Sequence, residues 1–125
     1  MKTSAIAAGL AVVLFAGAAA AQSAMTLDAY VTQANRIPMN PTAILRSDTR
    51  RLIRVTNESF AVIRRDIRAD RAAGRRPAAC PPEKVQMNPR QLLGFLNAIP
   101  QPRRARMSVV EGLSAWMADR YPCAA

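Results

Sequence analysis

The chain has 125 residues, and its 18 Lys and Arg against 8 Asp and Glu give a formal net charge of +10. It contains no histidine, which excludes Ser-His-Asp and Cys-His catalysis and zinc sites built on imidazole. The length suits one domain. We therefore expect a small basic protein that is not an enzyme and that holds neither a metal nor another cofactor.

Residues 1–24 have the pattern of a secretory signal peptide. Lys2 precedes an uncharged apolar run over 5–16, and small residues lead to Ala21. Cleavage after Ala21 is favoured, with Ala19 at the −3 position, and cleavage after Ala24 is the alternative. The run is too short to cross about 30 Å of hydrocarbon comfortably, which argues against an uncleaved anchor. We therefore expect a periplasmic or secreted protein.

Removal of this leader would leave 17 cationic and 8 acidic residues, a net charge of +9, and all the cations except Lys84 are arginine. Arginine suits the recognition of carboxylates and phosphates. A high arginine content also follows from genomic base composition, so the count alone does not establish a function.

Apolar residues beyond residue 25 recur at spacings of three and four, which predicts helices. Thr26 is placed to cap a short first helix, and Asn40-Pro41 to open a turn through 42–45. The longest helix should run from Ser47 to about Ala73, where Gly74 stops it. Its apolar stripe is Leu52, Thr56, Phe60, Ile63 and Ile67.

In the C-terminal part, Asn88-Pro89 repeats the cap followed by proline and predicts a further helix. Its buried face is expected to consist of Leu92, Leu93, Leu96 and Ile99. Prolines 100 and 102 separate this helix from the last one, which should stop at Tyr121-Pro122. Residues 25–125 are thus predicted to form a single all-α domain, a small bundle of four to five helices.

Cys80 and Cys123 are the two cysteines of the chain. Export would place them in an oxidising compartment, where one intramolecular disulfide is possible. A redox or nucleophilic pair is the alternative, but the cysteines are far apart in sequence and there is no histidine to activate them. We therefore predict a structural disulfide between Cys80 and Cys123.

Four arginines of the long helix, Arg64, Arg68, Arg71 and Arg75, follow one another at helical spacing and would line one strip. Asp66 and Asp70 have no arginine three or four residues away that could neutralise this charge. Such a strip is either a solvated face, as most charge runs are, or a docking face for an acidic protein or another polyanion.

A second cluster, Arg103, Arg104 and Arg106, is predicted to occupy the first turn of the last helix. The helix dipole disfavours cations there but favours a bound anion. The cluster is therefore a candidate anion site, unless the helix starts later or these side chains reach acidic groups elsewhere.

Nucleic acid is not an expected partner. Five aromatic residues remain after residue 24, and most have core-like spacing instead of alternating with arginines as base-stacking platforms would. After cleavage of the leader, no transmembrane segment is expected either.

The segment from Cys80-Pro-Pro through Asn88-Pro89 and Leu92-Leu93 to Tyr121-Pro122-Cys123 resembles the C-terminal part of the Tai-type, or resistance-associated, periplasmic immunity proteins of type VI secretion. The resemblance implies a helical, disulfide-bonded protein that inhibits a toxic cell-wall amidase. It covers about 44 residues, and residues 25–79 depart from the pattern because a further cysteine and a glycine-containing segment are missing. The stretch 68–82 also resembles a group of small exported bacterial proteins of uncharacterised activity.

We conclude that the chain is an exported helical binding protein. Its expected partner is another protein, and an acidic partner would match its basic charge. In this interpretation it could be an immunity-type inhibitor of a cell-wall-targeting toxin. The alternative is an envelope-associated accessory or stress protein that binds anionic surfaces through its arginine-rich helix.

Overall fold

The computed structural model describes residues 25–124, and the predicted signal peptide lies outside them. Between these limits the chain forms five α-helices and one 3-10 helix, without a strand. They are α2 (Leu27–Asn35), η1 (Pro41–Leu45), α3 (Ser47–Ala72), α4 (Pro89–Ala98), α5 (Gln101–Arg104) and α6 (Val109–Arg120). The predicted all-α fold is confirmed.

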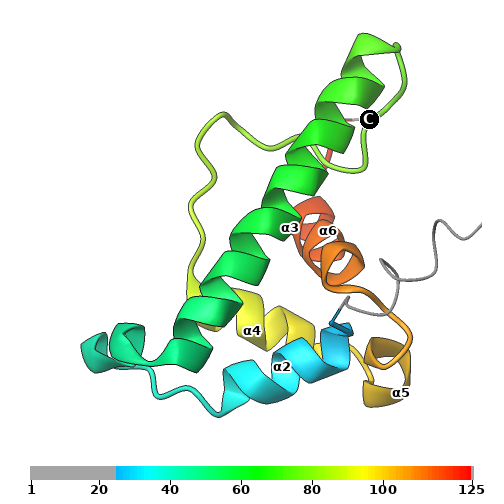
Figure 1. Cartoon of the computed structure of the whole chain (residues 1–125). Coiled ribbons are helices and arrows are strands. Elements are labelled where there is room, and N and C mark those ends of the chain that lie inside the picture. Colours follow the sequence, from blue (N-terminus) through cyan, green and yellow to red (C-terminus); the bar gives the residue numbers. More distant parts are fainter. Residues whose placement is uncertain (1–24, 125) are drawn as a thin grey trace, which may run out of the picture.

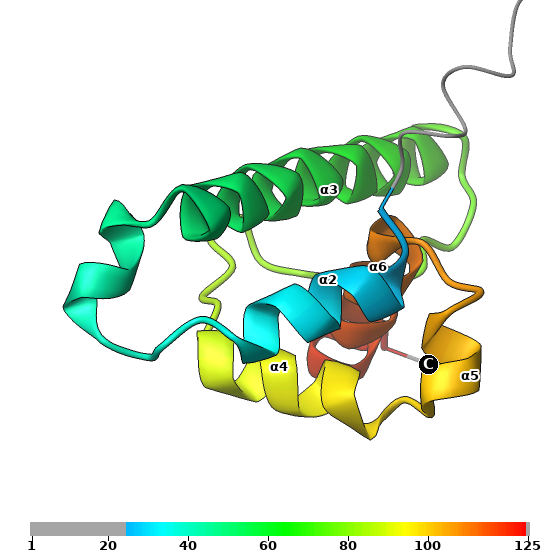
Figure 2. The same ribbon diagram turned by 60° about the horizontal axis from the view of Figure 1, so that its bottom comes forward.

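The helices form two layers (Figures 1 and 2). The 26 residues of α3 make one layer. Helices α2 and α6 pack against it, and α4 packs against α2 and α6. The completely buried side chains are Leu27 and Val31 of α2, Leu96 of α4, and Leu113 and Met117 of α6. All of α3's predicted apolar stripe is buried, and Phe60 meets the edge of Trp116 with 6.0 Å between ring centroids.

Local sequence signals set most helix ends. Thr26 caps α2 by accepting a hydrogen bond from the amide of Ala29, and Asn88 caps α4 by accepting from the amides of Arg90 and Gln91. At the end of α3, Gly74 has a φ of +71°, which glycine adopts without steric cost. The amide of Gly74 then donates to the carbonyl of Arg71, and that of Arg75 to Asp70, as in a Schellman motif.

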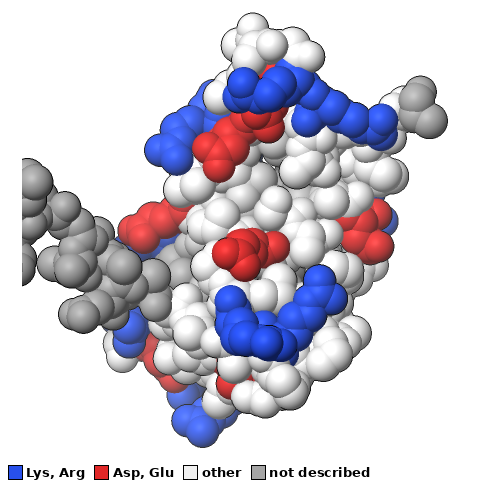
Figure 3. Space-filling view, turned by 90° about the vertical axis from the view of Figure 1, so that its right-hand side faces the viewer, with Lys and Arg blue, Asp and Glu red and all other residues white. Residues whose placement is uncertain are grey.

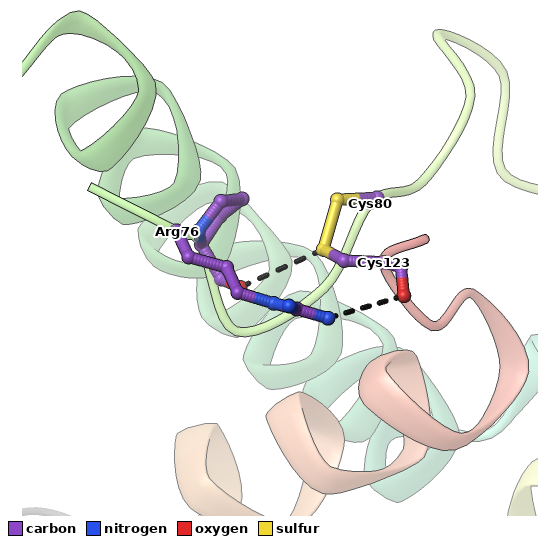
Figure 4. Close-up of a disulfide and its surroundings, with 4 residues drawn as sticks. Arg76, Cys80 and Cys123 are labelled. Carbon is purple, nitrogen blue, oxygen red and sulfur yellow. Dashed lines mark hydrogen bonds between the residues drawn. A yellow bond between two sulfur atoms is a disulfide. The ribbon is translucent and has the colours of Figure 1, made fainter. Parts of the chain in front are cut away.

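The predicted disulfide between Cys80 and Cys123 is present (Figure 4). It joins the segment after α3 to the tail after α6, and the amide of Cys80 donates to the carbonyl of Tyr121 beside it. The guanidinium of Arg76 donates to the carbonyl of Cys123 at 3.2 Å. These contacts hold the C-terminal tail against the loop that precedes α4.

Candidate functional site

An open apolar groove of about 900 Å³ lies where α2, η1, α3 and α4 meet. Tyr30 and Ala34 line it from α2, and Leu52 and Ile53 from the first half of α3. The opposite side comes from α4 and the residues before it, which include Leu92, Leu93, Leu96, Met87 and Pro89. The segment from Ile37 to Pro41 completes the lining. This volume lies in the range of sites that bind ligands or peptide side chains.

Large apolar side chains remain exposed at the groove. Met39 is 50% exposed, Ile53 is 43% exposed and Met87 is 40% exposed, and all three line it. On η1, Ile44 and Leu45 are also exposed although they do not line the groove. A concentration of exposed apolar surface of this kind marks interaction sites. Together with its three exposed lining residues, this cavity is called the apolar groove below.

The polar lining of the apolar groove includes hydroxyl groups. The Thr56 hydroxyl donates to the carbonyl of Leu52 at 2.7 Å and accepts from the hydroxyl of Tyr30 at 2.7 Å. Burial raises the pKa of Tyr30 above its ordinary value, and the hydrogen bond to Thr56 opposes this only in part. Thr49 Oγ1 is buried and has no hydrogen-bond partner within residues 25–124.

The charge of the apolar groove is positive. Arg90 lines it, and none of its lining residues within the described part of the chain is acidic. At the start of α3, Arg46 donates to Asp48 through two nitrogens, at 3.0 and 2.7 Å. This pairing lowers the pKa of Asp48 below its ordinary value. The negative charge of Asp48 is therefore already paired with Arg46.

The predicted strip of four arginines is partly formed. Arg64, Arg68 and Arg71 are exposed on α3, and none of them has a carboxylate partner within residues 25–124. Arg75 does not belong to the strip, because α3 ends at Ala72 and the chain turns at Gly74. Its guanidinium instead bonds to Asp70 at 3.1 Å. The three remaining residues, Arg64, Arg68 and Arg71, are called the arginine strip below.

The prediction that Arg103, Arg104 and Arg106 occupy the first turn of the last helix is wrong. Arg103 and Arg104 belong to α5, and Arg106 follows it. The last helix starts after Ser108, whose hydroxyl oxygen accepts from the amide of Glu111 at 3.1 Å. The three arginines therefore do not flank the start of that helix, and the geometric reason for an anion site there is lost.

Arg104 connects the end of α4 to α2. Its guanidinium bonds to Asp28 of α2 at 3.3 Å and to the carbonyls of Asn97 and Ile99, at 3.2 and 2.9 Å. It thereby caps the end of α4 and ties it to α2. Figure 3 shows cationic side chains at the top, near the far end of α3, and lower down, near α5, with acidic side chains between them and further cations along the lower left edge.

Other chemistry is limited in the described residues. Residues 25–124 contain no group of three or more acidic, cysteine or histidine side chains that could hold a metal ion. None of their helices has both the length and the apolar character needed to cross a bilayer.

Comparisons with protein-family models, with curated proteins and with solved structures gave no match.

Sequence reasoning missed the apolar groove, because its walls come from segments far apart in the chain. One signal was present, since the tripeptide Met-Asn-Pro occurs twice, at 39–41 and at 87–89. The asparagine and proline of each copy explain a helix start. They do not explain the methionine before them, and both methionines line the apolar groove.

Proposed function

We propose that this protein is a non-enzymatic, exported binding protein whose apolar groove takes an apolar segment of a partner protein. The observation that carries the proposal is the exposure of Met39, Ile53 and Met87 around one cavity of about 900 Å³. Burial of such side chains against a partner supplies binding free energy at about 25 cal/mol per Å² of apolar surface. The disulfide supports export, since disulfides persist in oxidising compartments.

The resemblance of residues 80–123 to periplasmic immunity proteins supports a finer form of the proposal. In that form the partner is an exported cell-wall amidase, and the segment that enters the apolar groove belongs to this toxin. Inhibition would then follow from occlusion of the toxin, because the chain itself needs no reactive group.

The test uses a phage-displayed library of random peptides of about 20 residues, selected on the folded, oxidised protein. We expect selected peptides to lose about tenfold or more in affinity when Ile53→Asp places a charge in the apolar groove. Leu45→Asp is the matched control, because Leu45 is 73% exposed on η1 and does not line the groove. Equal binding to wild type and Ile53→Asp, with both proteins folded by circular dichroism, would refute the proposal.

A second candidate function is adhesion to anionic envelope surfaces through the arginine strip, which is favoured by the absence of carboxylate partners for it within residues 25–124. Sedimentation with phosphatidylglycerol vesicles tests it, with phosphatidylcholine vesicles as the control. Adhesion through exposed charges should be lost between low and physiological ionic strength, because the screening length falls to about 8 Å. Equal sedimentation with both lipids would exclude this function.

A further inference from the structure

The repeated tripeptide Met-Asn-Pro gives the apolar groove two similar edges. In each copy the asparagine precedes the first residue of a helix, η1 or α4, and the proline occupies that first position. The methionine before each asparagine lines the groove, and its unbranched side chain is flexible. Flexible thioether side chains adapt to differently shaped apolar partners.

The arginine strip lies on the same side of α3 as the apolar groove. Arg64 and Arg71 follow the groove residue Ile53 by 11 and 18 positions, which places them within about 20° of it around the helix axis. The same spacing puts them about 16 and 27 Å further along α3. Arg68 lies about 60° from Ile53. Cationic side chains therefore follow the groove along this side of α3, beginning about 16 Å beyond Ile53.

Charge decides which occupant fits this surface. A second copy of the chain would bring Arg90 and the arginine strip towards like charges, and like charges facing each other across an interface oppose association. An acidic partner would meet cations that have no carboxylate partner in residues 25–124. The length of the surface also exceeds what a compact small molecule would span.

We propose that the apolar groove and the arginine strip together bind one amphipathic, acidic helix of a partner protein. Its apolar residues lie between Met39 and Met87, and its acidic residues follow about 16 to 27 Å further along and pair with the arginine strip. This inference rests on the function proposed above and adds the chemistry of the partner segment. Such helices present anchors at i, i+3, i+4 and i+7.

The peptides selected from the random library test the inference. They should contain apolar residues at helical spacing, followed by a block of aspartate and glutamate. The triple variant Arg64→Gln/Arg68→Gln/Arg71→Gln should bind them about tenfold more weakly at low ionic strength, and this difference should shrink in high salt.

The matched control removes the same charge from positions of α3 that lie further around the helix from the groove. Arg51 and Arg65 lie about 160° and 120° from Ile53, and Arg54 lies about 100° from it. The variant Arg51→Gln/Arg54→Gln/Arg65→Gln should therefore bind the peptides nearly as well as wild type does.

Each failure has a distinct meaning. Selected peptides without acidic residues, or equal weakening by the two triple variants, would overturn the acidic helix and leave the groove as the binding site. Peptides that bind Ile53→Asp as tightly as wild type, or a library that yields no binder, would overturn both proposals. A dimer in sedimentation velocity that Ile53→Asp abolishes would assign the groove to a second copy of the chain.

Discussion

Replacement of Gly112 by alanine tests the close contact between α2 and α6. Gly112 of α6 faces Leu27 of α2, and a Cβ atom at Gly112 would lie 2.6 Å from both Cδ1 and Cδ2 of Leu27 and 3.1 Å from its Cγ. Leu27 is completely buried, so any shift of its side chain takes place within the packed core. Overpacking of this kind costs about 1–3 kcal/mol. Gly112→Ala should therefore strain the junction of α2 and α6.

The matched control is Gly94→Ala in α4, where an added Cβ would have no atom within 4 Å. Alanine gains about 0.8–1.0 kcal/mol over glycine inside a helix, and this gain is common to both variants. We expect Gly112→Ala to be about 1–3 kcal/mol less stable than Gly94→Ala in urea unfolding. For a domain of this size each kcal/mol corresponds to a Tm difference of about 4–8 °C. If the two variants have the same free energy of unfolding, α2 and α6 do not approach as closely as the structure requires.

Three further changes test the parts that hold the fold together. Cys80→Ala/Cys123→Ala should lose about 4 kcal/mol of stability in urea, because the disulfide closes a loop of about 44 residues; an unchanged midpoint would contradict this. Tyr30→Phe removes a buried hydrogen bond and should cost about 0.5–1.5 kcal/mol near neutral pH. Burial raises the pKa of Tyr30 above its ordinary value of 10.0. The stability that the neutral tyrosine contributes is therefore present below pH 10 and is lost as the pH rises through the folded-state pKa. The free energy of unfolding should then decline less steeply in alkali for Tyr30→Phe than for wild type. Arg104→Ala should cost about 2 kcal/mol in thermal unfolding, whereas the exposed Arg103→Ala should stay within about 0.5 kcal/mol of wild type; equal effects would argue against the capping of α4 by Arg104.

Local signals were sufficient to predict most of the fold. The caps at Thr26 and Asn88 and the stop at Gly74 each act through backbone groups a few residues away, so they can be read from the sequence alone. The disulfide was predictable because one cysteine pair allows one intramolecular bridge. The start of the last helix was mispredicted because Gln101–Arg104 form a short helix of their own, and a second cap at Ser108 follows it within a few residues.

The candidate site could not be predicted in the same way. The apolar groove depends on how α2, η1, α3 and α4 meet, and no local spacing encodes that arrangement. The arginine strip was predictable as far as the helix extends, and the prediction failed at Arg75 because the turn at Gly74 redirects the chain towards Asp70. Arg104 was included in a candidate anion site because its protein acceptor, Asp28, lies 76 residues away in sequence and could not be identified from local spacing.

Both cysteines follow the exposed turn at Gly74, so the cystine closes a ring within the C-terminal half and leaves the α2–α3 half outside it. A protease that cuts between Arg75 and Arg76 would divide the polypeptide into two fragments that no covalent bond joins. Their cohesion would then depend on the packing of α2 against α4 and α6 and of α3 against α6, including the contact of Phe60 with Trp116. The molecule is therefore suited to reconstitution as a split protein, in which one fragment carries its own crosslink and the other supplies the long helix.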